Sequence, residues 1–103
     1  MRLRDIAHSR TGDKGSTVNI SLIPFHEDDY PRLLRYVTAD GVRRHFDGII
    51  AGDVVRYEVP GIGALNFVLR GALGGGVTRS LALDAHGKSL SSALLSMEIG
   101  EDQ

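Results

Sequence analysis

The sequence predicts an α+β fold with about four strands in one antiparallel sheet and helices on one face of that sheet. Three observations lead to this prediction. Segments of alternating apolar and polar residues are interspersed with segments of helical periodicity. The chain has 103 residues, the length of one ordinary domain, so residues 1–103 are taken as a single domain. Hydrophobic residues make up 42% of it, which is enough to build one core.

The first elements are two strands. Residues Leu3 to His8 predict a strand, and residues 9–17 predict a loop because they are polar and contain two glycines. Residues 18–22 alternate apolar and polar side chains, which is typical of a half-buried strand, and Pro24 ends it. The two strands are expected to form a hairpin. Its connection of about nine residues exceeds the usual two to five, and long ordered loops in small domains are often functional.

Two helices are expected next. Acidic residues at positions 28 and 29, followed by Pro31, mark the start of the first helix. Thr38 has the position of an N-cap for a second, short helix that ends near Phe46. Apolar residues recur at helical spacing in both segments, so each helix is expected to bury one face.

The second half of the chain predicts two more strands and two more helices. Residues Val54 to Val59 are rich in β-branched and aromatic side chains and predict a strand that ends at Pro60. Residues Leu65 to Leu73 carry apolar side chains at i, i+3, i+4 and i+7, so a short helix is expected there. A strand is expected over Val77 to Leu83, and Ser89 is expected to cap a final helix.

This order of elements favours a ferredoxin-like two-layer sandwich, with the helices on one side of the sheet. The other side of the sheet must then be polar or covered. One face of the strand at 54–59 carries Val55, Tyr57 and Val59 and is apolar. If both faces of the sheet hold apolar groups, two copies can pack sheet on sheet, and a homo-oligomer is therefore expected.

Composition argues against several classes of protein. The net charge of −1 argues against nucleic-acid binding, and the absence of cysteine excludes disulfides and thiolate chemistry. No stretch approaches the roughly 18 apolar residues of a membrane span, and the start does not resemble a signal peptide. We therefore expect a cytoplasmic protein without membrane association. The four histidines are scattered, so no metal site is expected, and no cofactor is predicted.

The loop at 9–17 and the residue before it form the first candidate site. Arg10 and Lys14 can reach an anion, and glycine-flexed loops can present backbone N–H groups to a phosphate, a carboxylate or coenzyme A. Alternatively the loop is structural, with Asp13 accepting backbone hydrogen bonds. His8 is a candidate general base or a hydrogen-bonded residue at the end of a strand. A hydrolytic set of His8, Ser9 and Asp13 is chemically possible, but such sets normally converge from distant segments.

The second candidate site lies around three consecutive glycines at 74–76. Asn66 and Arg70 are the polar side chains of the apolar run that precedes these glycines, and Arg79 follows them on an apolar strand face. An unpaired buried guanidinium is costly, so Arg79 needs a counter-charge. Either an internal carboxylate or the carboxylate or phosphate of a ligand can supply it.

Two segments resemble a known family. LRDIAHSRTGDKGSTVNISLIP near the start and YEVPGIGALNFVLRGALGGGVTRSLALDAHGKSLSSALLSMEI near the end resemble the C-terminal domain of the acyclic terpene utilisation protein (AtuA) family. The resemblance implies a ferredoxin-like fold and a role in bacterial catabolism of acyclic terpenoids or branched acyl-CoA compounds. Full-length members have a much longer N-terminal region, so a stand-alone small subunit is expected here. The resemblance carries over no catalytic residue.

Two functions remain open. In the first, the chain is an accessory or interaction domain that is not catalytic alone and works with copies of itself or with a larger AtuA N-terminal-like subunit. In the second, it is a small enzyme or enzyme subunit. Its 9–17 loop and its 60–80 glycine-rich segment would then bind an acyl-CoA, a terpenoid acid or another carboxylate.

Overall fold

The fold was analysed in a computed structural model of the chain, which describes residues 1–14, 17–47, 50, 52–71 and 88–100. Four strands are present in these ranges: β1 (Ala7–Lys14), β2 (Thr17–Pro24), β3 (Val54–Val59) and β4 (Ala64–Arg70). Three α-helices accompany them: α1 (Tyr30–Tyr36), α2 (Ala39–His45) and α4 (Lys88–Leu95). Two short 3-10 helices, η1 (Leu3–Asp5) and η2 (Glu27–Asp29), precede β1 and α1.

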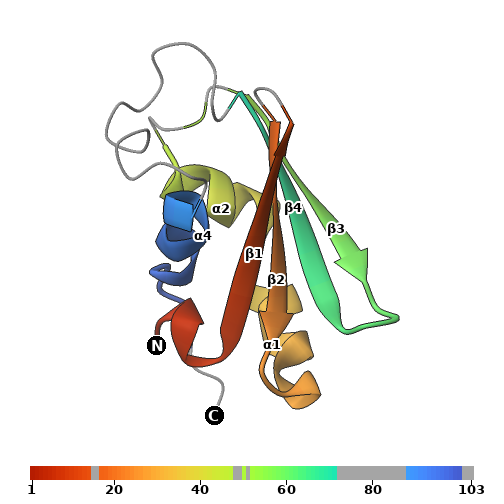
Figure 1. Cartoon of the computed structure of the whole chain (residues 1–103). Coiled ribbons are helices and arrows are strands. Elements are labelled where there is room, and N and C mark those ends of the chain that lie inside the picture. The colour runs from red at the N-terminus through yellow and green to blue at the C-terminus, as the bar shows by residue number, and fades with distance from the viewer. Residues whose placement is uncertain (15–16, 48–49, 51, 72–87, 101–103) are drawn as a thin grey trace.

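The four strands form one antiparallel sheet in the order β1-β2-β4-β3. The hairpins β1-β2 and β3-β4 therefore meet through their second strands, and β1 and β3 are the two edges of the sheet that the described strands form. Helices α1, α2 and α4 lie on one face of the sheet (Figure 1). This arrangement confirms the predicted α+β two-layer fold, with a four-stranded antiparallel sheet and helices on one side.

The core lies between the sheet and the helices. Strand β2 alternates half-buried and buried residues along its whole length, as its sequence predicts. Its buried residues pair with the buried residues of β4, so Ile20 faces the core beside Phe67. The helices close the other side with Leu33 and Val42, and with Leu90 of α4. Only one face of the sheet is thus used for the core.

Both expected helix starts in the middle of the chain are confirmed. Proline stands in the first turn of α1, where its missing N–H is not needed. The hydroxyl oxygen of Thr38 accepts a hydrogen bond of 3.0 Å from the backbone N–H of Gly41 and caps α2. The strand predicted over Val54 to Val59 has these same bounds in the structure.

The prediction for the first two elements is partly wrong. Leu3 to Asp5 form a 3-10 helix, and the strand runs from Ala7 to Lys14 through most of the expected loop. Every residue of this polar segment pairs in register with β2, from Ala7 with Pro24 to Lys14 with Thr17. Inter-strand hydrogen bonding satisfies the backbone of such a segment whatever its side chains are, and composition alone does not reveal it.

The helix predicted over Leu65 to Leu73 is also wrong. Residues 64–70 form strand β4, which pairs with β2 on one side and β3 on the other. The final helix begins at Lys88, so Ser89 lies inside it and is not its cap. The strand predicted over Val77 to Leu83 lies outside the described residues. Among the residues that are described, no helix is both long and apolar enough to cross a membrane.

Candidate functional site

The candidate site is the face of the sheet opposite the helices, called here the open face. Strand pairing assigns the residues of this face, because side chains alternate between the two sides of each strand. The contributing positions are His8, Arg10 and Gly12 of β1; Thr17, Asn19, Ser21 and Ile23 of β2; Ala64, Asn66, Val68 and Arg70 of β4; and Val55, Tyr57 and Val59 of β3.

Contacts of the neighbouring residues confirm which side of the sheet is open. Ser9, next to His8, contacts Ser91 of α4 through its hydroxyl oxygen and donates to the Ser91 carbonyl at 3.3 Å. Arg56, next to Tyr57, donates to the carbonyl oxygens at the end of α1. Both residues face the helical layer, so their neighbours His8 and Tyr57 face the other way.

The open face is positively charged. Among the described side chains, its strand positions include Arg10 and Arg70 but no aspartate or glutamate. In the part of the chain that the structure describes, the exposed guanidinium groups of Arg10 and Arg70 have no hydrogen-bond or ion-pair partner. Arginine presents a planar set of donors that suits carboxylates and phosphates. The guanidinium groups of Arg10 and Arg70 are therefore accessible to an anion on this face.

A row of polar side chains crosses the middle of the open face. Arg10 of β1 lies opposite Ser21 of β2, which lies opposite Asn66 of β4, which lies opposite Tyr57 of β3. The Asn66 side-chain N–H donates to the Ser21 hydroxyl oxygen at 3.1 Å. This bond ties the two central strands together through their side chains and fixes the amide between Ser21 and Tyr57.

Apolar side chains gather toward the β3-β4 turn. Tyr57 is 51% exposed and Ile62, in the turn, is 72% exposed. At the same end of the sheet, Phe25 follows β2 and stacks on the His8 ring with centroids 5.5 Å apart. Large exposed apolar groups that gather on one face are typical of an interaction surface.

The structure brings together four of the seven candidate residues named from the sequence. His8, Arg10, Asn66 and Arg70 all lie on the open face. Lys14 and Asp13 are also part of β1, where they pair with Thr17 and Val18 of β2. Arg79 lies outside the described residues.

The structure does not assemble a hydrolytic set from His8, Ser9 and Asp13. Ser9 occupies a strand position on the side of the sheet opposite His8 and bonds to α4. The ring contact of His8 is with Phe25. No group of three or more histidine or carboxylate side chains in the described ranges is placed to hold a metal ion. The described residues of the open face thus combine two exposed guanidinium groups with exposed apolar side chains.

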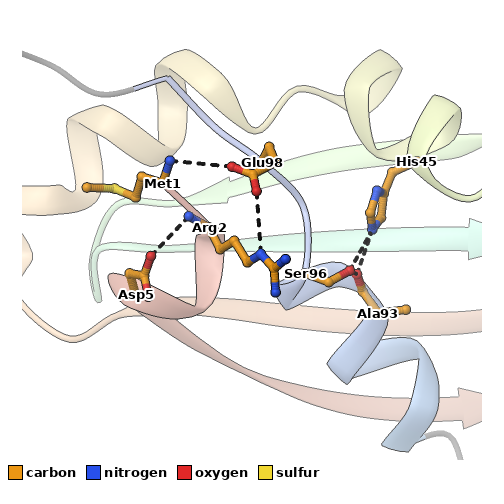
Figure 2. A network of polar contacts seen from close by, with 7 residues as sticks. All are labelled: Met1, Arg2, Asp5, His45, Ala93, Ser96 and Glu98. Carbon is orange, nitrogen blue, oxygen red and sulfur yellow. Dashed lines mark hydrogen bonds and ion pairs between the residues drawn. The ribbon is translucent and has the colours of Figure 1, made fainter.

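A second polar cluster lies on the other side of the molecule and holds the helical layer together (Figure 2). The His45 Nε2–H of α2 donates to the Ala93 carbonyl at 2.6 Å, and the Ser96 hydroxyl donates to the same carbonyl. Glu98 pairs with the N-terminal amine and with Arg2, each at 3.4 Å. These contacts join neighbouring elements to one another, so we assign this cluster a structural role.

The sequence analysis missed Phe25 and Ile62 as site residues. Phe25 directly follows a strand that alternates buried and half-buried residues, so continued alternation places it on the open side. Ile62 stands in a turn of otherwise small residues, where a large apolar side chain has no strand to pack on. The exposure of each residue could be predicted only once the neighbouring strands were known.

Comparison with known proteins gives one match. A search of the curated proteins found no relative, and a search of the solved structures found no similar chain. The family model of the AtuA ferredoxin-like domain matches residues 1–100, almost the whole chain. Its name agrees with the two-layer architecture seen here and with the resemblance carried by the two glycine-containing segments. The chain therefore belongs to the AtuA ferredoxin-like domain family.

Proposed function

We propose that this domain is a cytoplasmic accessory subunit in bacterial catabolism of acyclic terpenoids or branched acyl-CoA compounds, and that it is not catalytic alone. Family membership supports the metabolic setting. The open face supports the accessory role, because its described residues offer cations and exposed apolar groups to a partner. The partner is a larger AtuA N-terminal-like subunit that binds the open face.

The main observation behind this proposal is that two arginines without a partner among the described residues share the open face with exposed apolar side chains. Arg10 and Arg70 supply charge without a counter-ion among the described residues, and Tyr57 supplies exposed aromatic area. Arginine and tyrosine are enriched in the residues that dominate protein interfaces. Electrostatic complementarity requires that the partner surface be acidic and partly apolar.

The dimensions of the open face favour a protein partner. Four strands spaced about 4.8 Å apart, each about seven residues long, cover roughly 20 Å by 23 Å. This is the scale of a small protein interface, of the order of 800 Å² of accessible surface for each partner once side chains are included. Small molecules normally bind in concave sites, whereas one side of an open sheet is broad.

The test is co-expression of the domain with the larger AtuA-type subunit, followed by size-exclusion chromatography with light scattering. We expect a complex, and we expect Arg10→Glu to weaken it at least tenfold because the substitution reverses a charge in the contact. The matched control is Arg43→Glu on α2, an exposed arginine of the helical layer, which should bind as the native domain does.

Complex formation should also weaken with added salt, since exposed charges are screened within about 10 Å at 0.1 M ionic strength. A domain that never associates with the larger subunit contradicts the proposal. So does a complex that Arg43→Glu weakens as much as Arg10→Glu, because the helical layer would then be the contact surface.

A second function is favoured by the unpaired guanidinium groups alone. The domain would bind an acyl-CoA or a terpenoid acid, with the ligand's phosphate or carboxylate on Arg10 or Arg70. A thermal-shift panel of acyl-CoAs, terpenoid acids and free coenzyme A tests it. A ligand at 100 times its Kd adds about 2.7 kcal/mol of stability. Arg70→Ala should abolish that shift and leave the Tm of the unliganded domain nearly unchanged, and the absence of any shift would refute this function.

A further inference from the structure

Among the described strands, β3 is an edge of the sheet. It pairs with β4 on one side and with no other described strand. Its sequence, VVRYEV, is rich in β-branched and aromatic residues and contains no proline or lysine. Natural proteins normally blunt such an edge with lysine, proline, a bulge or a covering element, because a bare edge recruits another strand. Between Val54 and Val59 the pairing with β4 is continuous and shows no bulge.

The hydrogen-bond pattern shows which backbone groups of β3 point outward. The Arg70 N–H donates to the Asp53 carbonyl at 2.9 Å, so these two residues face each other in a hydrogen-bonded pair. Pairs in an antiparallel ladder alternate, so Val55, Tyr57 and Val59 bond to β4. The N–H and C=O groups of the residues between them, Val54, Arg56 and Glu58, therefore point to the free edge.

A second copy of β3 can pair with this edge only through the same three residues. In the register centred on Tyr57, Arg56 lies opposite the partner's Glu58, and Val55 lies opposite the partner's Val59. The pairs from Val55 to Val59 are then favourable: opposite charges, two tyrosines, and valine with valine. Val54 lies opposite the partner's Pro60, which has no N–H to donate. The register centred on Arg56 places two arginines directly opposite each other, which is destabilising. Charge complementarity thus favours the register centred on Tyr57 over the register centred on Arg56.

The side chain of Arg56 is held in one position by contacts within its own chain. Its guanidinium donates to the Leu34 and Val37 carbonyls at 2.8 Å and 3.0 Å and lies 3.3 Å from the Glu58 carboxylate. The side chain is held at the helix side of the edge and is only 21% exposed. Because the Arg56 side chain is held in this position, it leaves the outward-pointing backbone groups of β3 accessible to an incoming strand.

We propose that the domain forms a homodimer by antiparallel pairing of β3 with β3 of a second copy, centred on Tyr57. The product is one continuous eight-stranded sheet with both helical layers on the same side. Its open faces become contiguous, and the two tyrosines meet at the two-fold axis. Sheet-on-sheet packing of open faces is disfavoured instead, because it brings two positively charged surfaces together.

This dimer goes beyond the proposed function and does not depend on it, since β3 edge pairing leaves the open face free. The first test is the mass of the native domain in solution, measured over a dilution series by sedimentation equilibrium. We expect a dimer that dissociates on dilution. Glu58→Arg should be monomeric at every concentration in the series, because Arg56 would then face an arginine.

A charge-swap experiment tests the register. Glu58→Arg places two arginines at positions 56 and 58 of one chain, and Arg56→Glu places two glutamates at the same positions of the other. Each variant alone should be monomeric, whereas an equimolar mixture should form a heterodimer in which both cross-strand pairs have opposite charges. Circular dichroism must first confirm that Arg56→Glu is folded, because Arg56 also bonds to α1.

A cysteine experiment keeps the proposal testable if Arg56→Glu fails to fold. The chain contains no cysteine, so each variant carries a single thiol. Residues opposite each other in a pair that is not hydrogen-bonded have Cα atoms about 4.5 Å apart, within reach of a disulfide. Tyr57→Cys should therefore form a disulfide dimer with mild oxidant. Val55→Cys is the matched control, because the two Val55 positions would be separated by roughly 13 Å along the strands.

Each outcome decides the question. Cross-linking of Tyr57→Cys together with a monomeric Glu58→Arg supports the dimer and its register. A native domain that stays monomeric throughout the dilution series overturns the proposal. A dimer that survives Glu58→Arg, or that cross-links Val55→Cys as fast as Tyr57→Cys, also overturns it and indicates an interface elsewhere.

Discussion

At the residue scale, Arg56 links the sheet to the helical layer. The two carbonyl oxygens that it binds, those of Leu34 and Val37, lie at the end of α1, where helix carbonyls lack partners within the helix. Arginine reaches both because its donors form a rigid fork. An arginine in the middle of a strand is therefore explained here by the helix above it.

We predict that Arg56→Lys lowers the free energy of unfolding by about 1–3 kcal/mol, because lysine keeps the charge but cannot bind both carbonyls in the same geometry. Urea denaturation at one fixed protein concentration measures this change. Arg43→Lys, at an exposed position of α2, is the control and should change stability by less than about 0.5 kcal/mol. Equal effects of the two substitutions would show that the contacts with α1 do not contribute.

A second prediction at this scale concerns glycine at position 52. A Cβ atom there would lie 2.6 Å from the Arg70 carbonyl oxygen, closer than real Cβ contacts. We expect Gly52→Ala to cost about 1–3 kcal/mol, because the backbone beside β4 must move. Gly61→Ala is the control: a Cβ there meets nothing within 4 Å, so the change should be neutral or should stabilise by at most about 1 kcal/mol. Differential scanning calorimetry compares them, and equal Tm values for the two variants would contradict the prediction.

At the element scale, Thr38 is the N-cap of α2 in the structure, as the sequence predicts. Thr38→Ala should destabilise the domain by about 1 kcal/mol, because the Gly41 N–H loses its hydrogen-bond acceptor. Thr38→Ser keeps the hydroxyl and should restore most of that loss. Thermal unfolding monitored by circular dichroism separates the variants. A serine variant as unstable as the alanine variant would indicate that the threonine methyl group matters and the cap does not.

Local signals also explain which elements could be predicted. The two central helices start at a proline and at an N-cap threonine, and these residues act within one turn of themselves. Strand β4 could not be assigned in this way. Over seven residues, apolar positions 65, 68 and 69 fit a helix, and Leu65, Phe67 and Leu69 fit a strand equally well. Pairing with β2 and β3 on both sides decides between them, and that information is not local.

Several residues of the candidate site could be named from the sequence, but their arrangement in space could not. His8, Arg10, Asn66 and Arg70 were singled out because they are polar groups next to glycines or apolar runs, and they do share one face. The sequence placed them in two separate segments whose proximity was open. Strand β2 joins these segments, since its open-face residues lie between those of β1 and β4. Only the strand order supplies that connection.

At the scale of the whole molecule, the two faces of the sheet differ in burial. Phe67 on the helix side is fully buried, whereas Tyr57 on the open side is half exposed. We expect Phe67→Ala to cost about 3–5 kcal/mol of stability, because it leaves a cavity in the core. Tyr57→Ala should leave the Tm of the monomer nearly unchanged and weaken association. A large drop in Tm on Tyr57→Ala, measured at high dilution, would show that the open face is needed for folding.

The segments at residues 1–2 and 98–99 pair with each other. The free energies of ion pairing and of apolar burial can be compared to find which interaction holds them together. Arg2 and Glu98 form an isolated β-bridge, the Ile99 N–H donates to the Met1 carbonyl at 2.9 Å, and Ile99 is 8% exposed. The Glu98 ion pairs are exposed, and such pairs contribute at most about 1 kcal/mol. Burial of an isoleucine side chain contributes about 1.5–3 kcal/mol. The apolar residue should therefore dominate the closure.

We predict that Ile99→Ala costs about 2 kcal/mol or more and that Glu98→Gln costs less than about 1 kcal/mol. Urea denaturation at fixed protein concentration gives both values, and repetition at high salt gives a second criterion. Salt screens the Glu98 contacts but not the contacts of Ile99, so the deficit of Glu98→Gln should vanish and that of Ile99→Ala should persist. The opposite ranking would mean that charge, rather than burial, joins the two ends. The N-terminal amine itself would then be part of what keeps the helical layer on the sheet.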